Sequence, residues 1–122
     1  MLRALLLVGI GGFFGSIARY VLAIAINKVS SHPYPLATFT INLLGCFLIG
    51  LLFGLVGRNQ IQNDVWLILA TGFCGGFTTF SAFALENVNL FDKQLSVTAL
   101  LYTVLSVVVG IFLCRLGILL VR

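Results

Sequence analysis

The sequence is poor in charge. Of its 122 residues, only 8% are Asp, Glu, Lys or Arg, whereas 61% are hydrophobic. A soluble domain carries about 25% charged residues, and a chain of this length has too much surface for its volume to bury so many apolar groups. A soluble globular domain is therefore excluded, and we expect the apolar surface to contact the lipid bilayer.

Histidine, cysteine and acidic residues are also scarce. The chain has one His, three Cys and three acidic residues. The cysteines lie singly in apolar runs and have neither a disulfide nor a metal-ligand spacing, and no Ser-His-Asp or Cys-His group is present, so no enzyme is expected. The net charge is +4, but the basic residues are scattered and form no patch of the kind that binds nucleic acid.

Four long apolar runs occupy most of the chain, at residues 4–26, 36–57, 65–91 and 97–121. A helix needs about 20 mostly apolar residues to cross a bilayer, and each run is long enough. The linkers hold most of the polar residues and both prolines, Pro33 and Pro35, as is typical of helix boundaries. We expect an all-α membrane protein, a single domain over residues 1–122 with four transmembrane helices.

The distribution of Lys and Arg gives little information on orientation. With four spans, the termini and the second linker share a side, which carries four basic residues, namely Arg3, Arg58, Arg115 and Arg122. The opposite side carries three, namely Arg19, Lys28 and Lys93. This imbalance is weak. Two alternatives stay open: one ordinary topology, or insertion in both orientations followed by antiparallel pairing of two copies.

Glycines are concentrated in the first two spans. The first contains Gly9, Gly11, Gly12 and Gly15, and Gly50 and Gly54 form a GxxxG in the second. Small residues four apart let membrane helices approach closely. This pattern predicts tight helix packing.

The third span contains the unusual stretch GFCGGFTTFSAF, residues 72–83. Its glycine pair, Gly75-Gly76, is followed at once by hydroxyl side chains. Unsatisfied backbone groups are costly in hydrocarbon, so a break is tolerated only where it is buried in protein or lines a cavity. We expect the glycines to permit a break near residues 75–79, whose carbonyl oxygens would suit a small cation. A helix that merely bends, with its hydroxyls bonded to their own backbone, is the alternative.

Aromatic and polar side chains could line a path for a small anion. Phe80 and Phe83 share a helix face, and the edge of a phenyl ring is positive. Asn42 in the second span and Tyr102 and Ser106 in the fourth span offer hydrogen-bond donors. Lipid-facing rings and polar bonds that merely join helices are the alternatives.

Two charges lie inside the spans, Arg19 and Glu86. A charge in a membrane helix is expected to find a partner, water or the interface. Arg19 could raise the local concentration of anions at a pore mouth.

Three segments together resemble one known family. GGFFGSIARY (11–20), TFTINLLGCFLIG (38–50) and TGFCGGFTTFSAFALE (71–86) closely resemble the Fluc/CrcB fluoride channels, and the likeness covers nearly the whole chain. It implies an antiparallel dual-topology homodimer in the bacterial inner membrane, with two pores for passive fluoride export. It also implies a structural Na⁺ at the subunit interface, held by the carbonyls of Gly75 and Thr78.

The same resemblance implies roles for the pore residues. Phe80 and Phe83 correspond to the pore phenylalanines and Asn42 to the pore-lining amide, while Arg19 matches an arginine in the first span. The polar track along the pore is assigned four residues, namely Thr79, Ser81, Tyr102 and Ser106. Ser16 stands where the family more often has alanine, a change of one small residue for another.

Two other functions are alternatives to a fluoride channel. A small proton-coupled multidrug exporter also has four short spans, but it would need an acid in the first span, whose one interior charge is Arg19. A structural membrane subunit would explain the glycines, but not the coincidence of a break, hydroxyls and a phenylalanine pair.

Overall fold

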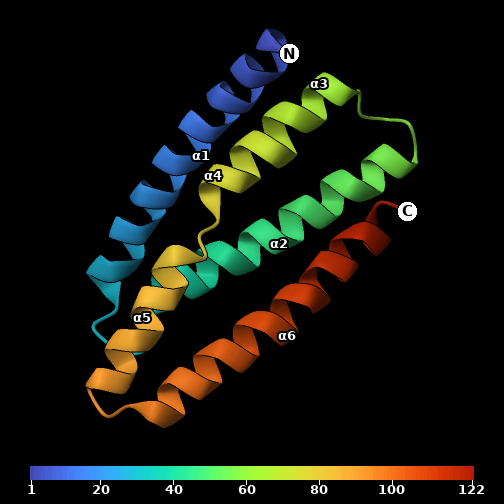
Figure 1. Cartoon of the computed structure of the whole chain (residues 1–122). Coiled ribbons are helices and arrows are strands. Elements are labelled where there is room, and N and C mark those ends of the chain that lie inside the picture. The colour runs from blue at the N-terminus through green and yellow to red at the C-terminus, as the bar shows by residue number, and fades with distance from the viewer.

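The computed structural model describes all residues from 1 to 122 as an all-helical chain (Figure 1). The elements are α1 (Leu2–Val29), α2 (Leu36–Gly57), α3 (Asn63–Trp66), the π-helix η1 (Leu67–Cys74), α4 (Gly75–Phe77), α5 (Ser81–Asp92) and α6 (Ser96–Leu120). Four stretches are long and apolar enough to cross a membrane: Leu2–Val29, Leu36–Gly57, Asn63–Asp92 and Ser96–Leu120. They agree with the predicted spans to within a few residues.

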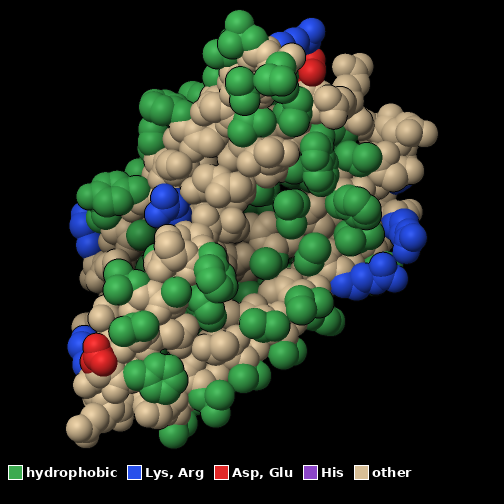
Figure 2. Space-filling view, in the orientation of Figure 1, with side chains coloured by type: hydrophobic (Ala, Val, Ile, Leu, Met, Phe, Trp, Pro, Cys, Tyr) green, Lys and Arg blue, Asp and Glu red, His purple; other side chains and the backbone are tan.

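The packed interior of the chain is small. Only 16 of the 122 residues are buried, and large apolar side chains are exposed along every long helix. Hydrophobic side chains cover much of the face in Figure 2, while the Lys and Arg side chains lie mainly along its margins. Contiguous apolar surface of this extent needs a bilayer or another protein to cover it. The chain is a multi-pass membrane protein.

The two termini lie at the same end of the molecule as the linker between the second and third spans (Figure 1). Arg3 forms a salt bridge with Asp64 at the start of α3. Arg58 Nη1, in the linker, donates to the backbone oxygen of Val121 at 3.0 Å. These contacts hold together the side predicted for both termini.

The predicted close packing of glycine-bearing helices is confirmed. A Cβ atom added to Gly11 or Gly15 would collide with backbone oxygens of η1, and one added to Gly50 would collide with the backbone of α6. On α6, a Cβ on Gly117 would lie 2.5 Å from the Phe47 oxygen of α2. Only a residue without a side chain permits such backbone approach.

The third span is interrupted, but not at the glycine pair. Gly75–Phe77 is still helical, no glycine has a positive φ, and the interruption covers residues 78–80, where Thr78 is extended (φ −85°, ψ 159°). The expectation that the glycines loosen the backbone is therefore corrected. Gly76 serves packing instead, because a Cβ there would lie 2.6 Å from the Gly12 oxygen of α1.

Candidate ion pathway and cation site

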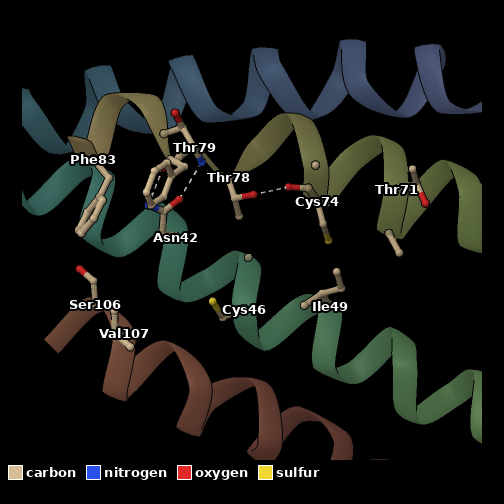
Figure 3. A pocket seen from close by; sticks show the side chains of 14 residues that line it. Asn42, Cys46, Ile49, Thr71, Cys74, Thr78, Thr79, Phe83, Ser106 and Val107 are labelled. Atoms are coloured by element: carbon tan, nitrogen blue, oxygen red, sulfur yellow. Dashed lines mark hydrogen bonds between the residues drawn. The ribbon is translucent and has the colours of Figure 1, made fainter. Parts of the chain in front are cut away.

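The interruption is held by side chains that replace the lost helical hydrogen bonds. The Thr79 backbone N–H donates to Asn42 Oδ1 at 2.8 Å, and Asn42 Nδ2 donates to the Thr79 carbonyl oxygen at 3.0 Å. The Thr78 hydroxyl donates to the Cys74 carbonyl oxygen at 2.9 Å. Figure 3 shows both sets of bonds, with α2 supplying Asn42 from below the break. The backbone polar groups of the break are thus largely satisfied, as hydrocarbon surroundings require.

Asn42 therefore has a structural contact that the sequence did not reveal. It was predicted as a pore-lining amide, and the structure places it at the break, half-buried and bonded to Thr79. An amide nitrogen carries two hydrogens, so one donor of Asn42 is left after the bond to Thr79. The side chain can hold the break and still offer a hydrogen bond to a ligand.

Two carbonyl oxygens at the break are not used by the protein. In a regular helix the N–H groups of Thr79 and Ala82 would donate to the oxygens of Gly75 and Thr78. Here the Thr79 N–H donates to Asn42 instead, and the Ala82 N–H donates to the Thr79 hydroxyl at 3.3 Å. No backbone N–H donates to the oxygens of Gly75 or Thr78. A Cβ added to Gly75 would meet nothing within 4 Å, so the space beside it is open. Free carbonyl oxygens beside open space are the donor set that suits a small hard cation.

Arg19 lies next to these carbonyls. Its Nε donates to the Gly76 carbonyl oxygen at 3.1 Å, and the side chain is half-buried between α1 and α4. Arg19 was expected to need a partner inside the membrane, and the Gly76 carbonyl of α4 provides it. A cation near the carbonyls that terminate a helix is also favourable toward its dipole.

A cavity of about 500 Å³ opens beside the break. Its lining comes from α2, η1, α4, the break, α5 and α6. It includes most of the predicted site: Asn42, Gly75, Thr78, Thr79, Phe80, Phe83 and Ser106. Figure 3 shows Ser106 and Val107 on α6 across the cavity from Asn42 and Thr79. Two predicted pathway residues, Ser81 and Tyr102, are not in the lining.

The two phenylalanines both line this cavity. Their ring centroids are 5.7 Å apart, with an interplanar angle of 39°. The Phe80 side is open, with 79% of the residue exposed, while the Phe83 ring packs against Tyr102 at a centroid distance of 5.0 Å. A tilted pair of rings presents edges rather than faces to part of its surroundings.

Buried hydroxyls without a partner continue beyond Phe83. The hydroxyls of Ser106, Tyr102 and Tyr34 are buried and make no hydrogen bond in the chain. An unmet buried polar group is costly, so such groups mark places where a ligand or water can bind. Ser81 differs, because it is exposed and its hydroxyl lies 3.4 Å from that of Thr79.

Sequence comparison agrees with these features. Residues 6–118 match the family described as CrcB-like protein, Camphor Resistance (CrcB). The chain belongs to the CrcB family. It is 43% identical over 118 residues to the fluoride-specific ion channel FluC of Azobacteroides pseudotrichonymphae, with 96% of this chain and 94% of the relative covered. It is 44% identical over 117 residues to FluC of Phocaeicola vulgatus, with 96% and 97% covered.

A third CrcB relative, FluC of Methylobacillus flagellatus, is 44% identical over 119 residues, covering 96% of this chain and 93% of that protein. All three relatives carry the name of an ion channel. The family is thus one of channels and not of enzymes, as the lack of a catalytic group in the sequence indicated.

Sequence reasoning missed two hydrogen bonds and one aromatic contact of this CrcB chain. The Thr38 hydroxyl donates to Glu86 Oε1 at 2.6 Å, which gives the second interior charge its partner. Tyr34 was not singled out, although it lies between two prolines and packs edge-on against Tyr102 at 5.5 Å. Asn87, bonded to Thr103 at 3.0 Å, gave no signal, because a lone amide has many possible partners.

Proposed function

We propose that this chain is a fluoride-selective channel that lets fluoride leave the cytoplasm passively. Its relatives are named fluoride-specific ion channels, and the identity to them extends over nearly the whole chain. The observation that carries the proposal is the cavity at the break, which gathers hydroxyl, amide and phenyl groups from separate helices.

The chemistry of that cavity fits a small, strongly hydrated anion. Moving an isolated ion into a medium of low dielectric costs tens of kcal/mol, so a pore must replace the lost water with close donors. Within the cavity, the free N–H of Asn42 and the partnerless hydroxyl of Ser106 can serve. The partnerless hydroxyl of Tyr102, which packs against Phe83 outside the lining, is a further candidate donor. Thr79 and Ser81, whose hydroxyl oxygens lie 3.4 Å apart, extend this polar track.

Phe80 and Phe83 provide the weaker attraction for the anion. Ring edges attract an anion through the quadrupole without a full charge, and conduction requires that no site hold the ion too tightly. A narrow path beside the two rings should also disfavour larger halides.

The working unit that we propose is an antiparallel homodimer with two pores and a Na⁺ at its interface. One chain offers two free carbonyl oxygens, from Gly75 and Thr78, which is fewer than the several oxygen ligands that a hard cation takes in proteins. A second copy related by a two-fold axis would double the number of carbonyls. The ion would then fix the two broken spans against each other.

Two features of the chain support this arrangement. Gly75 and Phe80, which flank the break, are both exposed in the single chain, so this surface is available to a second copy. The small charge imbalance between the two sides is compatible with insertion in both orientations. We assign the protein to the bacterial inner membrane, where such a channel would drain fluoride from the cytoplasm.

The test uses purified protein in liposomes loaded with fluoride. A fluoride electrode records efflux after a K⁺ ionophore is added to balance charge, and chloride-loaded liposomes are the control. Rapid fluoride efflux without chloride efflux is the expected result. Proton-coupled uptake of a cationic drug without any fluoride efflux would replace the channel by an exporter, and neither activity would leave only a structural subunit.

A further inference from the structure

The helix that carries Phe83 is short and separated from the one before it. The helix α5 has 12 residues, and the break at residues 78–80 disconnects it from α4. The helical backbone therefore does not determine how α5 is rotated about its own axis. Contacts with neighbouring helices have to set that rotation, and with it the direction of the Phe83 ring.

Asn87 makes two hydrogen bonds, one within α5 and one to α6, and only the second can act on this rotation. Its Nδ2 donates to the Phe83 carbonyl oxygen at 3.1 Å, and its Oδ1 accepts a hydrogen bond from the Thr103 hydroxyl of α6 at 3.0 Å. An amide can donate and accept at the same time, so the three residues form one chain of hydrogen bonds. The side chain is half-buried and does not line the cavity.

The residue before Thr103 on α6, Tyr102, contacts the side chain of Phe83. Tyr102 packs against the Phe83 ring at a centroid distance of 5.0 Å, and Thr103 reaches the Phe83 carbonyl through Asn87. Tyr102 thus contacts the Phe83 ring directly, whereas Thr103 is linked to the Phe83 backbone only through Asn87. A shift of one residue in this register would turn α5 by about 100° and move the ring off Tyr102.

We propose that Asn87 is a positioning residue, which sets the direction of the Phe83 ring through its bond to Thr103. This inference rests on the proposed function, because it assigns Phe83 to the pore. Asn87 itself does not contact the ion. It acts because α5, unlike part of a continuous helix, relies on contacts with its neighbours to fix its rotation. Two side-chain hydrogen bonds join α5 to other spans, Thr38–Glu86 to α2 and Thr103–Asn87 to α6, and only the second also reaches the Phe83 backbone.

The experiment compares single and double variants in the fluoride efflux assay. Asn87→Leu and Thr103→Val should each slow efflux roughly three- to fifteen-fold, the range that one interhelical bond in a membrane produces. The double variant should be no slower than the slower single variant, because both remove the same bond. Thr103→Ser keeps the hydroxyl and should conduct normally. Asn89→Leu, on the exposed side of α5, is the matched control.

A second readout separates positioning from mere stability and does not need conduction. With 4-fluorophenylalanine at position 83, the ¹⁹F resonance should shift or broaden in Asn87→Leu and Thr103→Val, and stay unchanged in Asn89→Leu. Lower thermal stability with unaltered efflux and resonance would overturn the proposal. If Asn87→Leu does not fold, Thr103→Val alone decides, since it removes only a hydroxyl. A parent protein without fluoride efflux would refute the channel, while the resonance would still test the contact.

Discussion

The side-chain amide of Asn42 bonds both polar groups of the Thr79 backbone, at 2.8 and 3.0 Å, although the two residues are 37 positions apart. These bonds fix the orientation of the Asn42 amide, because the Thr79 N–H can only donate and must therefore face Oδ1. The second span thus completes the hydrogen bonding of the third where the helix stops. A break in mid-membrane and the residue that makes it tolerable come from different helices.

Asn42→Leu should destabilise the protein and stop conduction. The substitution leaves the Thr79 N–H and C=O without partners, and each unsatisfied buried group costs about 1–3 kcal/mol. We expect a lower midpoint of thermal unfolding in detergent, together with the loss of fluoride efflux. Asn27→Leu, an exposed site near the end of α1, is the control. If Asn42→Leu had the same unfolding midpoint and the same fluoride efflux as the parent protein, the two hydrogen bonds between Asn42 and Thr79 would be dispensable.

Phe80→Ile and Phe83→Ile should slow fluoride while leaving the protein assembled. Isoleucine is apolar but has no positive ring edge. A loss of about 1.4 kcal/mol of ion stabilisation corresponds to about tenfold in rate. Efflux from liposomes gives the rate, and size-exclusion chromatography checks assembly. Phe91→Ile, an exposed residue of the same helix, should conduct normally; full efflux in all three variants would remove the rings from the mechanism.

Hydropathy sufficed to predict four spans, because lipid imposes a minimum apolar length on every crossing helix. The glycines of the first two spans were also informative, since Gly11 and Gly50 lie where backbone meets backbone. Both signals are local. Each can be read from one segment without knowing its partner.

The site was less predictable because its contacts join distant segments. The sequence predicted a break near residues 75–79, yet the glycine pair stays helical and the backbone leaves the helix only at Thr78. The neighbouring Thr79 bonds to Asn42, which lies 37 positions earlier in the chain. The contacts of Tyr34 with Tyr102 and of Asn87 with Thr103 could not be predicted from the sequence either. A single tyrosine or amide says nothing about its partner until the helices are placed side by side.

Gly11→Ala and Gly9→Ala should differ sharply, although they are two residues apart on α1. A Cβ at Gly11 would collide with the Ile68 backbone oxygen, whereas a Cβ at Gly9 would meet nothing within 4 Å. Forcing extra volume into a tight contact costs about 1–3 kcal/mol, so only Gly11→Ala should lower the unfolding midpoint. Equal midpoints for the two variants would mean that α1 does not approach η1 this closely.

Removing Na⁺ should weaken the proposed dimer. If the ion binds only the assembled protein, each tenfold rise in Na⁺ above its dissociation constant adds about 1.4 kcal/mol to stability. We expect the unfolding midpoint to rise with Na⁺ and to stay flat when choline replaces it at the same ionic strength, which keeps screening constant.

The backbone origin of the proposed cation site can be tested separately. Thr78→Val removes the hydroxyl bond to Cys74 but keeps the main-chain carbonyl that would hold the ion. This variant should be less stable than the parent at every Na⁺ concentration and yet show the same slope of midpoint against the logarithm of Na⁺. A slope of zero in the parent would exclude a structural Na⁺. If the unfolding midpoint depended on Na⁺ in the parent but not in Thr78→Val, the ligand would be the Thr78 hydroxyl and not its carbonyl, because the substitution changes only the side chain.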